Sequence, residues 1–329
     1  MRALALRQPA RHPHARGLIA SAVVAIVNLY EAGSGELAVG HIKGTWRNLG
    51  RQLGTRTVGL RRIEIHAGHF STPAHEHGAE EEIFFVLAGA GILWQDGRTF
   101  AVGSGDCIVH RPKSGPHTLR AGAGGLDVLV FGQRLDASLT ALPRAGVAWS
   151  FPRWVELGAG DTPFAREAAA GPPECPAQEI DRPANVVALE HVEALLDGRV
   201  RRLGKTAGAH ATGLNHVVLK AGEQGAPVHC HSHEEELFVV LAGSSVLELW
   251  GRGATQPEEH QLRSGDVVSR PAGTGVAHTL RPGPDGVTYL AYGTREPTDM
   301  RYYPQSGRVS IPGLGIALRA PEIEHLPDF

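Results

Sequence analysis

The chain has 329 residues, which is too long for one average domain of ~150 residues and favours two domains. Hydrophobic residues make up 42% and charged residues 20%, a balance typical of a folded globular protein that excludes a disordered chain. The 34 acidic and 32 basic residues give a net charge of -2 with no long block of one sign. This charge balance excludes sequence-independent electrostatic binding of nucleic acid. No apolar run reaches the ~18 to 20 residues of a membrane span.

The cysteine and glycine counts indicate the compartment and the kind of fold. Cys107, Cys175 and Cys230 are too few and too irregularly spaced for a disulfide framework. They favour a reducing compartment, so we expect a cytoplasmic protein. The 42 glycines and 22 prolines favour many short strands joined by tight turns over long helices.

The chain contains two copies of one sequence pattern. Residues 73–89 read PAHEHGAEEEIFFVLAG and residues 227–243 read PVHCHSHEEELFVVLAG, with eleven of the seventeen positions identical at an offset of 154. Further downstream the copies realign at an offset of 161, which joins His117 to His278 and Arg134 to Arg295. A repeat of this length indicates duplicated domains.

The repeat divides the chain into four segments. We expect an N-terminal extension at 1–40, an N-terminal barrel at 41–151, a linker at 152–184, and a C-terminal barrel with a C-terminal tail at 185–329. The linker is rich in Ala, Gly and Pro.

Within each copy the apolar residues recur with a period of two, which predicts strands. The predicted strands lie at 57–65, 82–87 and 107–109 in the first copy, and at 212–220, 236–241 and 267–268 in the second. Residues 23–26 resemble residues 186–189, so we expect each copy to begin with a strand of its own. The pattern predicts an all-β protein of two tandem barrels or sandwiches with separate cores.

Each copy carries a set of residues suited to a metal ion. The first has His75-x-His77-x4-Glu82 followed by His117, and the second has His229-x-His231-x4-Glu236 followed by His278. Histidines at i and i+2 of a strand point to the same face, so both imidazoles can reach one ion. Three imidazoles and one carboxylate suit a divalent first-row metal and leave coordination positions open. We expect two metals per chain, with Fe(II) or Mn(II) favoured and Ni, Cu or Zn as alternatives.

Several residues near these sets are expected to have structural roles. The acidic residues beside the two carboxylates are interpreted as solvated loop charges: Glu80, Glu81, Glu234 and Glu235. His233 is placed in a loop, because the repeat pairs His229 and His231 with His75 and His77. Cys230 is expected to face away from the metal as a buried small residue. The histidines without a counterpart in the other copy could support the metal ligands or line a pocket, and we favour exposure for them: His66, His69, His110, His210 and His216.

Arg134 and Arg295 follow an apolar strand in their copies. Either arginine could hold an anion in a pocket. We favour a salt bridge to Asp136, Glu296 or Asp299.

The two motifs resemble those of the cupin superfamily. The first copy reads Gly68-x6-His75-x-His77-x4-Glu82-x6-Gly89, then Gly105-x6-Pro112-x2-Gly115-x-His117. The second reads Gly222-x6-His229-x-His231-x4-Glu236-x6-Gly243, then Gly265-x5-Pro271-x-Gly273-x4-His278. The chain therefore resembles a bicupin, which implies a double-stranded β-helix, a form of jelly roll, in each half.

The resemblance leaves the reaction open, because known bicupins include oxalate decarboxylases, quercetin-type and gentisate-type dioxygenases, and ureidoglycine aminohydrolases. The tail at 289–303 is similar to that of poorly characterised sugar-phosphate-isomerase-like cupins. The Ser-Glu-Asn-Ser-like lid run of oxalate decarboxylases does not occur in the sequence, which disfavours that activity.

The expected function is a metal-dependent oxidoreductase of the dioxygenase type, acting on a small organic molecule that chelates the metal. The alternatives are a metal-dependent isomerase or lyase of a sugar or hydroxy acid, and a non-catalytic bicupin that binds small molecules. No general acid or base is assigned. The expected partner is a small-molecule substrate, with no nucleic acid and no membrane, and a homo-oligomer is an open option.

Overall fold

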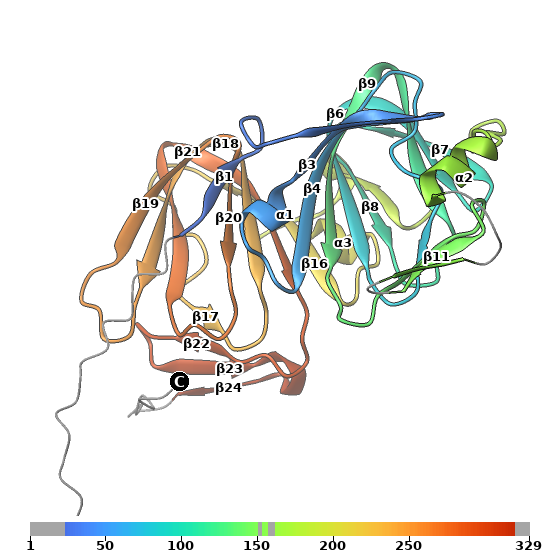
Figure 1. The fold of residues 1–329 in the computed structure, drawn as a ribbon. Helices are drawn as coiled ribbons and strands as arrows, with labels where there is room; N and C mark the ends of the chain where they lie inside the picture. The colour runs from blue at the N-terminus through green and yellow to red at the C-terminus, as the bar shows by residue number, and fades with distance from the viewer. Residues whose placement is uncertain (1–23, 151–152, 157–161, 320–329) are drawn as a thin grey trace, which may run out of the picture.

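The computed structural model describes residues 24–150, 153–156 and 162–319. The chain forms two jelly-roll domains that stand side by side, which we call the first and the second barrel (Figure 1). The predicted all-β fold with two barrels is confirmed. None of the described helices is long and apolar enough to cross a membrane.

The first barrel consists of a large and a small sheet. The large sheet has the order β13-β8-β6-β9-β4-β3-β2, with β7 paired to β6. Its strands are β2 (Gly35–Val39), β3 (Ile42–Asn48), β4 (Val58–Ile65), β6 (Glu82–Gln95), β7 (Arg98–Gly103), β8 (Asp106–His110), β9 (His117–Gln133) and β13 (Val186–Ala188). The small sheet has the order β12-β11-β10-β5, with β5 (Glu76–His77), β10 (Leu139–Leu142), β11 (Val147–Ser150) and β12 (Arg153–Glu156).

The second barrel repeats this plan. Its large sheet has the order β1-β20-β18-β21-β16-β15-β14, with β19 paired to β18. Its strands are β1 (Ile26–Asn28), β14 (Ala194–Leu195), β15 (Val200–Arg201), β16 (Thr212–Leu219), β18 (Glu236–Trp250), β19 (Glu258–Arg263), β20 (Asp266–Arg270) and β21 (Ala277–Thr294). The small sheet has the order β17-β22-β23-β24, with β17 (Cys230–His231), β22 (Arg301–Tyr303), β23 (Arg308–Ile311) and β24 (Ile316–Arg319). Both small sheets lie at the lower end of their barrels in Figure 1.

The helices are short and lie between the strands. The α-helices are α1 (Leu49–Gln52), α2 (Pro163–Ala169) and α3 (Leu203–Thr206), and single 3-10 turns span Leu189–His191 and Pro312–Leu314. The helices α1 and α3 occupy equivalent places, since each precedes the strand, β4 or β16, that starts the apolar part of its copy.

The glycine that ends each first motif is required by the backbone. Gly89 in β6 has φ +85°, and a Cβ there would overlap the carbonyl oxygen of Gly125. Gly243 in β18 has φ +74°, and a Cβ there would overlap the carbonyl oxygen of Gly286. The long strands change register beside both glycines, which bends them from one face of the barrel to the other.

The leading strands are exchanged between the barrels. β1 precedes the first copy in sequence but pairs with β20 of the second barrel, with Val27 opposite Val267. β13 precedes the second copy but pairs with β8 of the first barrel, with Val187 opposite Cys107. The prediction that each copy keeps its own leading strand is therefore wrong, and the expected 1–40 extension contributes β1 to one barrel and β2 to the other. The segment boundaries themselves stay a prediction.

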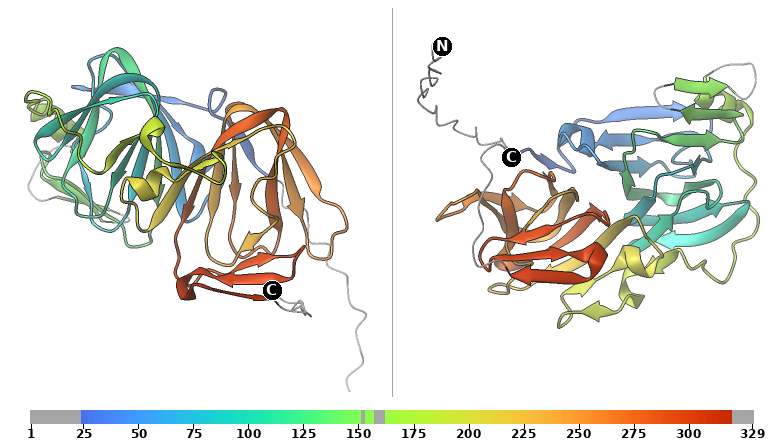
Figure 2. Two further views of the ribbon diagram at one scale, coloured as in Figure 1. Left: turned by 180° about the vertical axis from the view of Figure 1, so that it is seen from behind. Right: turned by 90° about the horizontal axis from the view of Figure 1, so that it is seen from below.

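The predicted linker is attached to the first barrel. Trp94 Nε1 donates to the carbonyl oxygen of Glu174 at 2.9 Å, and Thr99 Oγ1 donates to Pro176 O at 2.9 Å. Arg182 forms an ion pair with Asp106 at 2.6 Å. These contacts lead the chain along the first barrel to β13, and the three views of Figures 1 and 2 show this path on the outer side.

The two barrels share one hydrophobic core, which corrects the expectation of separate cores. A single cluster of buried residues contains Leu60, Phe131 and Val109 of the first barrel and Leu214 and Tyr292 of the second. The rings of Phe131 and Tyr292 lie 4.9 Å apart. Two further clusters each lie within one barrel. Burial of apolar side chains from both copies against each other therefore holds the barrels together.

Two buried carboxylates also join the barrels. Glu81, only 1% exposed, accepts hydrogen bonds from the second barrel: from His210 N at 2.8 Å, from Thr212 N at 2.9 Å and from Thr212 Oγ1 at 2.5 Å. Glu235, 3% exposed, accepts from Thr57 N at 2.7 Å and Thr57 Oγ1 at 2.9 Å in the first barrel. The interpretation of these two residues as solvated charges is wrong, because each satisfies backbone donors of the opposite barrel.

We expect Glu81→Ala and Glu235→Ala each to lower the free energy of unfolding by about 2 to 4 kcal/mol, because each leaves several buried donors without an acceptor. Urea denaturation followed by circular dichroism measures this change. The matched control is Glu193→Ala, since Glu193 is exposed, and it should stay within about 0.5 kcal/mol of wild type. Equal effects of all three substitutions would contradict the role of the carboxylates.

The shared core and the exchanged strands predict that both barrels unfold together. Differential scanning calorimetry should give a single transition, with the calorimetric enthalpy equal to the van't Hoff enthalpy. Two resolved transitions, each with about half of the heat, would show that the barrels are independent.

Candidate metal centres

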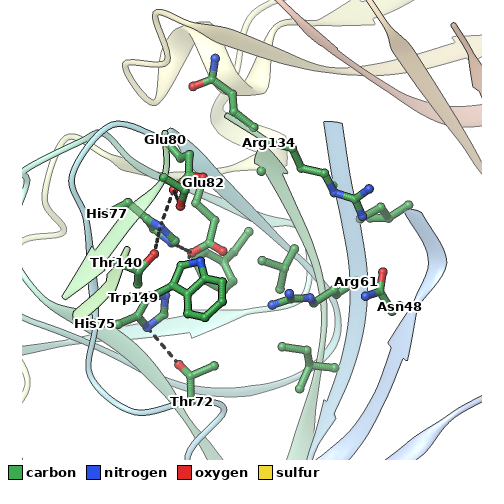
Figure 3. Close-up of a pocket in the computed structure, with 18 of the residues that line it drawn as sticks. Asn48, Arg61, Thr72, His75, His77, Glu80, Glu82, Arg134, Thr140 and Trp149 are labelled. Atoms are coloured by element: carbon green, nitrogen blue, oxygen red, sulfur yellow. Dashed lines mark hydrogen bonds and ion pairs between the residues drawn. The ribbon is translucent and has the colours of Figure 1, made fainter. Parts of the chain in front are cut away.

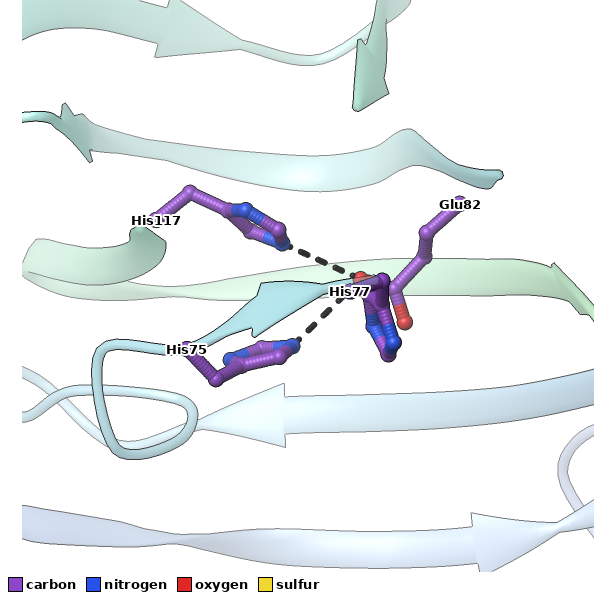
Figure 4. Close-up of side chains that lie close together, drawn as sticks. All are labelled: His75, His77, Glu82 and His117. Atoms are coloured by element: carbon purple, nitrogen blue, oxygen red, sulfur yellow. Dashed lines mark hydrogen bonds and ion pairs between the residues drawn. The ribbon is translucent and has the colours of Figure 1, made fainter. Parts of the chain in front are cut away.

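The first centre is assembled by strands that bring four side chains together (Figure 4). His77 belongs to β5, Glu82 begins β6 and His117 begins β9. His75 is held by its backbone, because its N–H donates to His117 O at 3.1 Å and its carbonyl oxygen accepts from His117 N at 2.9 Å. The four predicted residues therefore lie together, and their ligand atoms are within 4.8 Å of one another.

The three imidazoles surround one carboxylate oxygen. Glu82 Oε2 lies 3.6 Å from His75 Nε2, 3.5 Å from His77 Nε2 and 3.2 Å from His117 Nε2. His77 Nε2 is buried and has no hydrogen-bond partner among the described residues. A buried nitrogen without a partner is costly unless another group, such as a cation, completes the site.

The opposite ring nitrogens orient the histidines. His75 Nδ1 donates to Pro73 O at 2.9 Å, and His77 Nδ1 faces Glu80 Oε2 at 3.3 Å. Carbonyl and carboxylate oxygens hold Nδ1, so Nε2 is the nitrogen that each ring directs to the centre. Glu80 is buried rather than solvated, which corrects its interpretation as a loop charge.

The electrostatics favour an anionic Glu82. Burial alone would raise the pKa of Glu82, but charged His77 and hydrogen bonds from His117 and His75 hold it well below its usual range. Burial also lowers the pKa of His77, yet Glu82 and Glu80 together raise it to about 10. His117 has its pKa lowered to about 4, chiefly by burial. The site thus combines a carboxylate with at least one neutral imidazole.

His110 supports His117 from behind. The two rings stack with centroids 3.5 Å apart and planes 2° from parallel. His110 is 1% exposed, and burial holds its pKa well below the usual range. The prediction of exposure is wrong for His110, and also for His216, which is buried. An uninterrupted run of buried residues in β8 (Asp106–His110) explains the error for His110.

The second centre has the same arrangement of three histidines and one glutamate, with one difference. His229, Glu236 and His278 form one group of ligand atoms within 4.8 Å of one another, while His231 groups with Glu234 and Asp299. Glu236 Oε2 nevertheless lies 3.8 Å from His229 Nε2, 3.4 Å from His231 Nε2 and 3.0 Å from His278 Nε2. All four predicted residues therefore face one point, with His231 also engaged from its other side.

Asp299 is the site residue that the sequence did not predict in this role. His231 Nδ1 donates to Asp299 Oδ2 at 2.8 Å, and Asp299 is fully buried. Burial lowers the pKa of His231, but Asp299 and Glu236 raise it to about 9. A carboxylate behind a histidine increases the basicity of its far nitrogen. Asp299 has no repeated counterpart in the motifs, so the repeat gave no signal for it.

The neighbouring residues of the second centre also differ from expectation. Glu234 is buried and pairs with Arg301 NH2 at 3.1 Å, so it is no solvated charge. His233 is exposed and belongs to neither ligand group. Cys230 is buried among Val228, Ala277, Trp250 and Tyr302.

The two arginines after the apolar strands behave differently from each other. Arg134 NH1 donates to the carbonyl oxygen of Thr55 at 2.8 Å, and no carboxylate lies at ion-pair distance from it in the part of the chain that the structure describes. The favoured salt bridge is therefore not formed by Arg134. Arg295 lies 3.8 Å from Glu234, a partner that the sequence analysis did not name.

Each centre opens into a cavity. The first cavity has a volume of about 570 Å³, and Trp46, Trp149 and Phe164 contribute to its walls. Figure 3 shows Trp149, Arg61 and Arg134 near the metal ligands. The second cavity has a volume of about 610 Å³ and is lined by Arg295, Arg301 and Tyr303, among others. Both are large enough for a small organic molecule.

Comparisons with known proteins agree with this architecture. The family model described as "Cupin domain" matches residues 61–130 and again 215–286. A search of curated proteins finds no match. Solved structures of oxalate decarboxylase from Bacillus subtilis are similar: one, described for its Mn(II) centres, is 13% identical with a TM-score of 0.56, and covers 83% of this chain and 78% of its own.

A second structure, of an oxalate decarboxylase described for its substrate binding mode, is 15% identical with the same TM-score of 0.56 and the same coverage of 83% and 78%. A third, of the Bacillus subtilis enzyme at pH 4.6, is 15% identical with a TM-score of 0.55, and covers 81% of this chain and 75% of its own. At these identities the likeness shows the fold, not the activity. With two cupin matches and two jelly-roll domains, the chain belongs to the cupin superfamily and is a bicupin.

Proposed function

We propose that the chain is a metal-dependent enzyme that binds one divalent transition metal, Mn(II) or Fe(II), in each barrel. The first ion would be held by His75, His77, Glu82 and His117, and the second by His229, His231, Glu236 and His278. The convergence of three Nε2 atoms on one carboxylate oxygen in each barrel carries this proposal. Three nitrogens and one oxygen leave open positions on a six-coordinate ion.

We assign the reaction to the lyases, with a small carboxylic or hydroxy acid as substrate. A bound metal would act as a Lewis acid that polarises a chelating oxygen. Arg61 and Arg134 line the first cavity beside the metal ligands, where a guanidinium can hold a carboxylate. The solved structures described above, which share this fold over most of both chains, are of oxalate decarboxylase, which supports a lyase.

The cavity argues for a substrate larger than oxalate. About 570 Å³ would leave a two-carbon diacid largely unconfined. Trp46, Trp149 and Phe164 offer an apolar wall, which would exclude water from the body of a longer acid. We therefore propose an acid with an apolar portion that contacts these rings.

The second candidate function is a dioxygenase. The observation in its favour is the ligand set itself, because the same open positions could receive both substrate and oxygen. The two reactions differ in their demand for oxygen, so they can be separated by experiment.

The residue assignment predicts which second-barrel histidines hold metal. With the first centre disabled by His75→Ala, the additional change His229→Ala should abolish the remaining metal, because it removes one of four ligands. His233→Ala, the matched control on an exposed histidine, should keep one metal per chain. Metal titration with elemental analysis measures both. Loss of metal in His233→Ala with retention in His229→Ala would overturn the assignment.

The reaction assignment predicts turnover without oxygen. Metal-loaded protein should convert at least one member of a panel of 2-hydroxy and 2-oxo acids under strictly anaerobic conditions. Arg61→Gln should lower kcat/KM about tenfold or more, since it removes a charged contact to the carboxylate. The matched control Lys205→Gln, in the other cavity, should not change it. Consumption of one oxygen per product, with no anaerobic turnover, would favour the dioxygenase instead.

A further inference from the structure

The two cavities have the same arrangement of metal ligands but differ in charge. Two cationic side chains, Arg61 and Arg134, line the first cavity together with the carboxylates of Glu80 and Glu82. The carboxylate of Glu81 is bonded to the second barrel instead. Four cationic side chains line the second with one carboxylate, that of Glu236; they are Arg202, Lys205, Arg295 and Arg301. A pocket with a surplus of positive charge attracts and holds anions.

Equivalent positions in the two barrels show which residues give the second cavity its additional positive charges. Arg301 in β22 lies opposite His231, and Thr140 in β10 lies opposite His77 in the same way. Arg202 is the residue before α3, as Asn48 is the residue before α1. At two equivalent positions, therefore, a neutral side chain of the first barrel is an arginine in the second.

The inner cations are partly balanced. Arg301 NH2 lies 3.1 Å from Glu234 Oε2, and its Nε lies 3.6 Å from Asp299 Oδ2. Arg295 NH1 lies 3.8 Å from Glu234. These carboxylates lie behind the arginines and do not line the cavity, so the guanidinium groups are held in place with donors left for a ligand.

The two cationic side chains at the outer end of the cavity have no carboxylate partner among the described residues. Arg202 and Lys205, at either end of α3, are exposed and line the cavity. Neither has an ion pair with any residue in the described ranges. Tyr303, whose ring lies 5.7 Å from that of His229 at 22°, adds an aromatic surface to the cavity beside the centre.

We infer that the second cavity binds a small polyanion, either a dicarboxylate or a phosphate compound, that the first cavity does not bind. Its outer anionic group contacts Arg202 and Lys205, and its inner anionic group lies toward Arg295, Arg301 and the metal centre. The inference rests on the proposed function in one respect, because the second metal would add positive charge at the inner end. The two barrels thus bind different ligands.

The test is isothermal titration of the metal-loaded full chain with succinate, with inorganic phosphate and with neutral succinamide. We expect succinate or phosphate to saturate one site per chain, and succinamide to give no saturation. Saturation by succinate identifies a carboxylate ligand, and saturation by phosphate alone identifies a phosphate compound. The double change Arg202→Gln with Lys205→Gln should weaken the anion that binds by about tenfold or more.

The controls separate this inference from the proposed function. Arg61→Gln, a cation of the first cavity, should change the anion affinity less than twofold, and Arg202→Lys with Lys205→Arg should retain it if charge is the cause. Elemental analysis accompanies every titration. Two metals per chain without saturation by either anion overturns this inference alone, as does an equal loss in Arg61→Gln. Anion binding that persists without a second metal supports this inference and contradicts the proposed second metal centre.

Discussion

The structure depends on the reciprocal burial of two carboxylates, Glu81 and Glu235, against backbone donors of the opposite barrel. Each precedes a predicted metal ligand, Glu82 or Glu236, at the start of a long strand. Because successive strand residues face opposite sides, one carboxylate points to the interface while the next points into its barrel. The contact that joins the barrels therefore also fixes the carboxylate of each centre, and the exchanged strands and shared core reinforce it.

This coupling explains why two similar centres can differ in their surroundings without losing their geometry. The frame of each centre is set by β-ladder pairing and by the contacts of Glu81 and Glu235, which both copies retain. The cavity walls also include residues of the small sheets and residues beside α1 and α3. Side chains at these positions can change charge without disturbing the strand pairing. An example is Thr140 of the first barrel, whose equivalent in the second barrel is Arg301.

Much of the fold and of the candidate site could be predicted from the sequence, because both depend on local periodicity and on a repeat. Period-two patterning identified the strands, and the offset of 154 selected His229 over His233. The exchange of β1 and β13 could not be predicted, since three-residue strands of the same apolar character fit either sheet equally well. Asp299 lies 68 residues from His231, a distance in sequence that only the folded chain closes.

The interpretation of Glu81 and Glu235 as solvated charges is wrong although the sequence contains a signal for their structural role. A solvated loop charge is free to vary between copies, whereas these residues recur at the same offset as the predicted ligands. Residues that are identical in the two copies indicate what the shared fold and metal centre require. Residues that differ in charge, such as Asn48 and Arg202 or Thr140 and Arg301, indicate where the two cavities differ in what they bind. In a duplicated metalloprotein the ligand set therefore identifies the frame, and the positions where the copies diverge in charge carry the information about substrates.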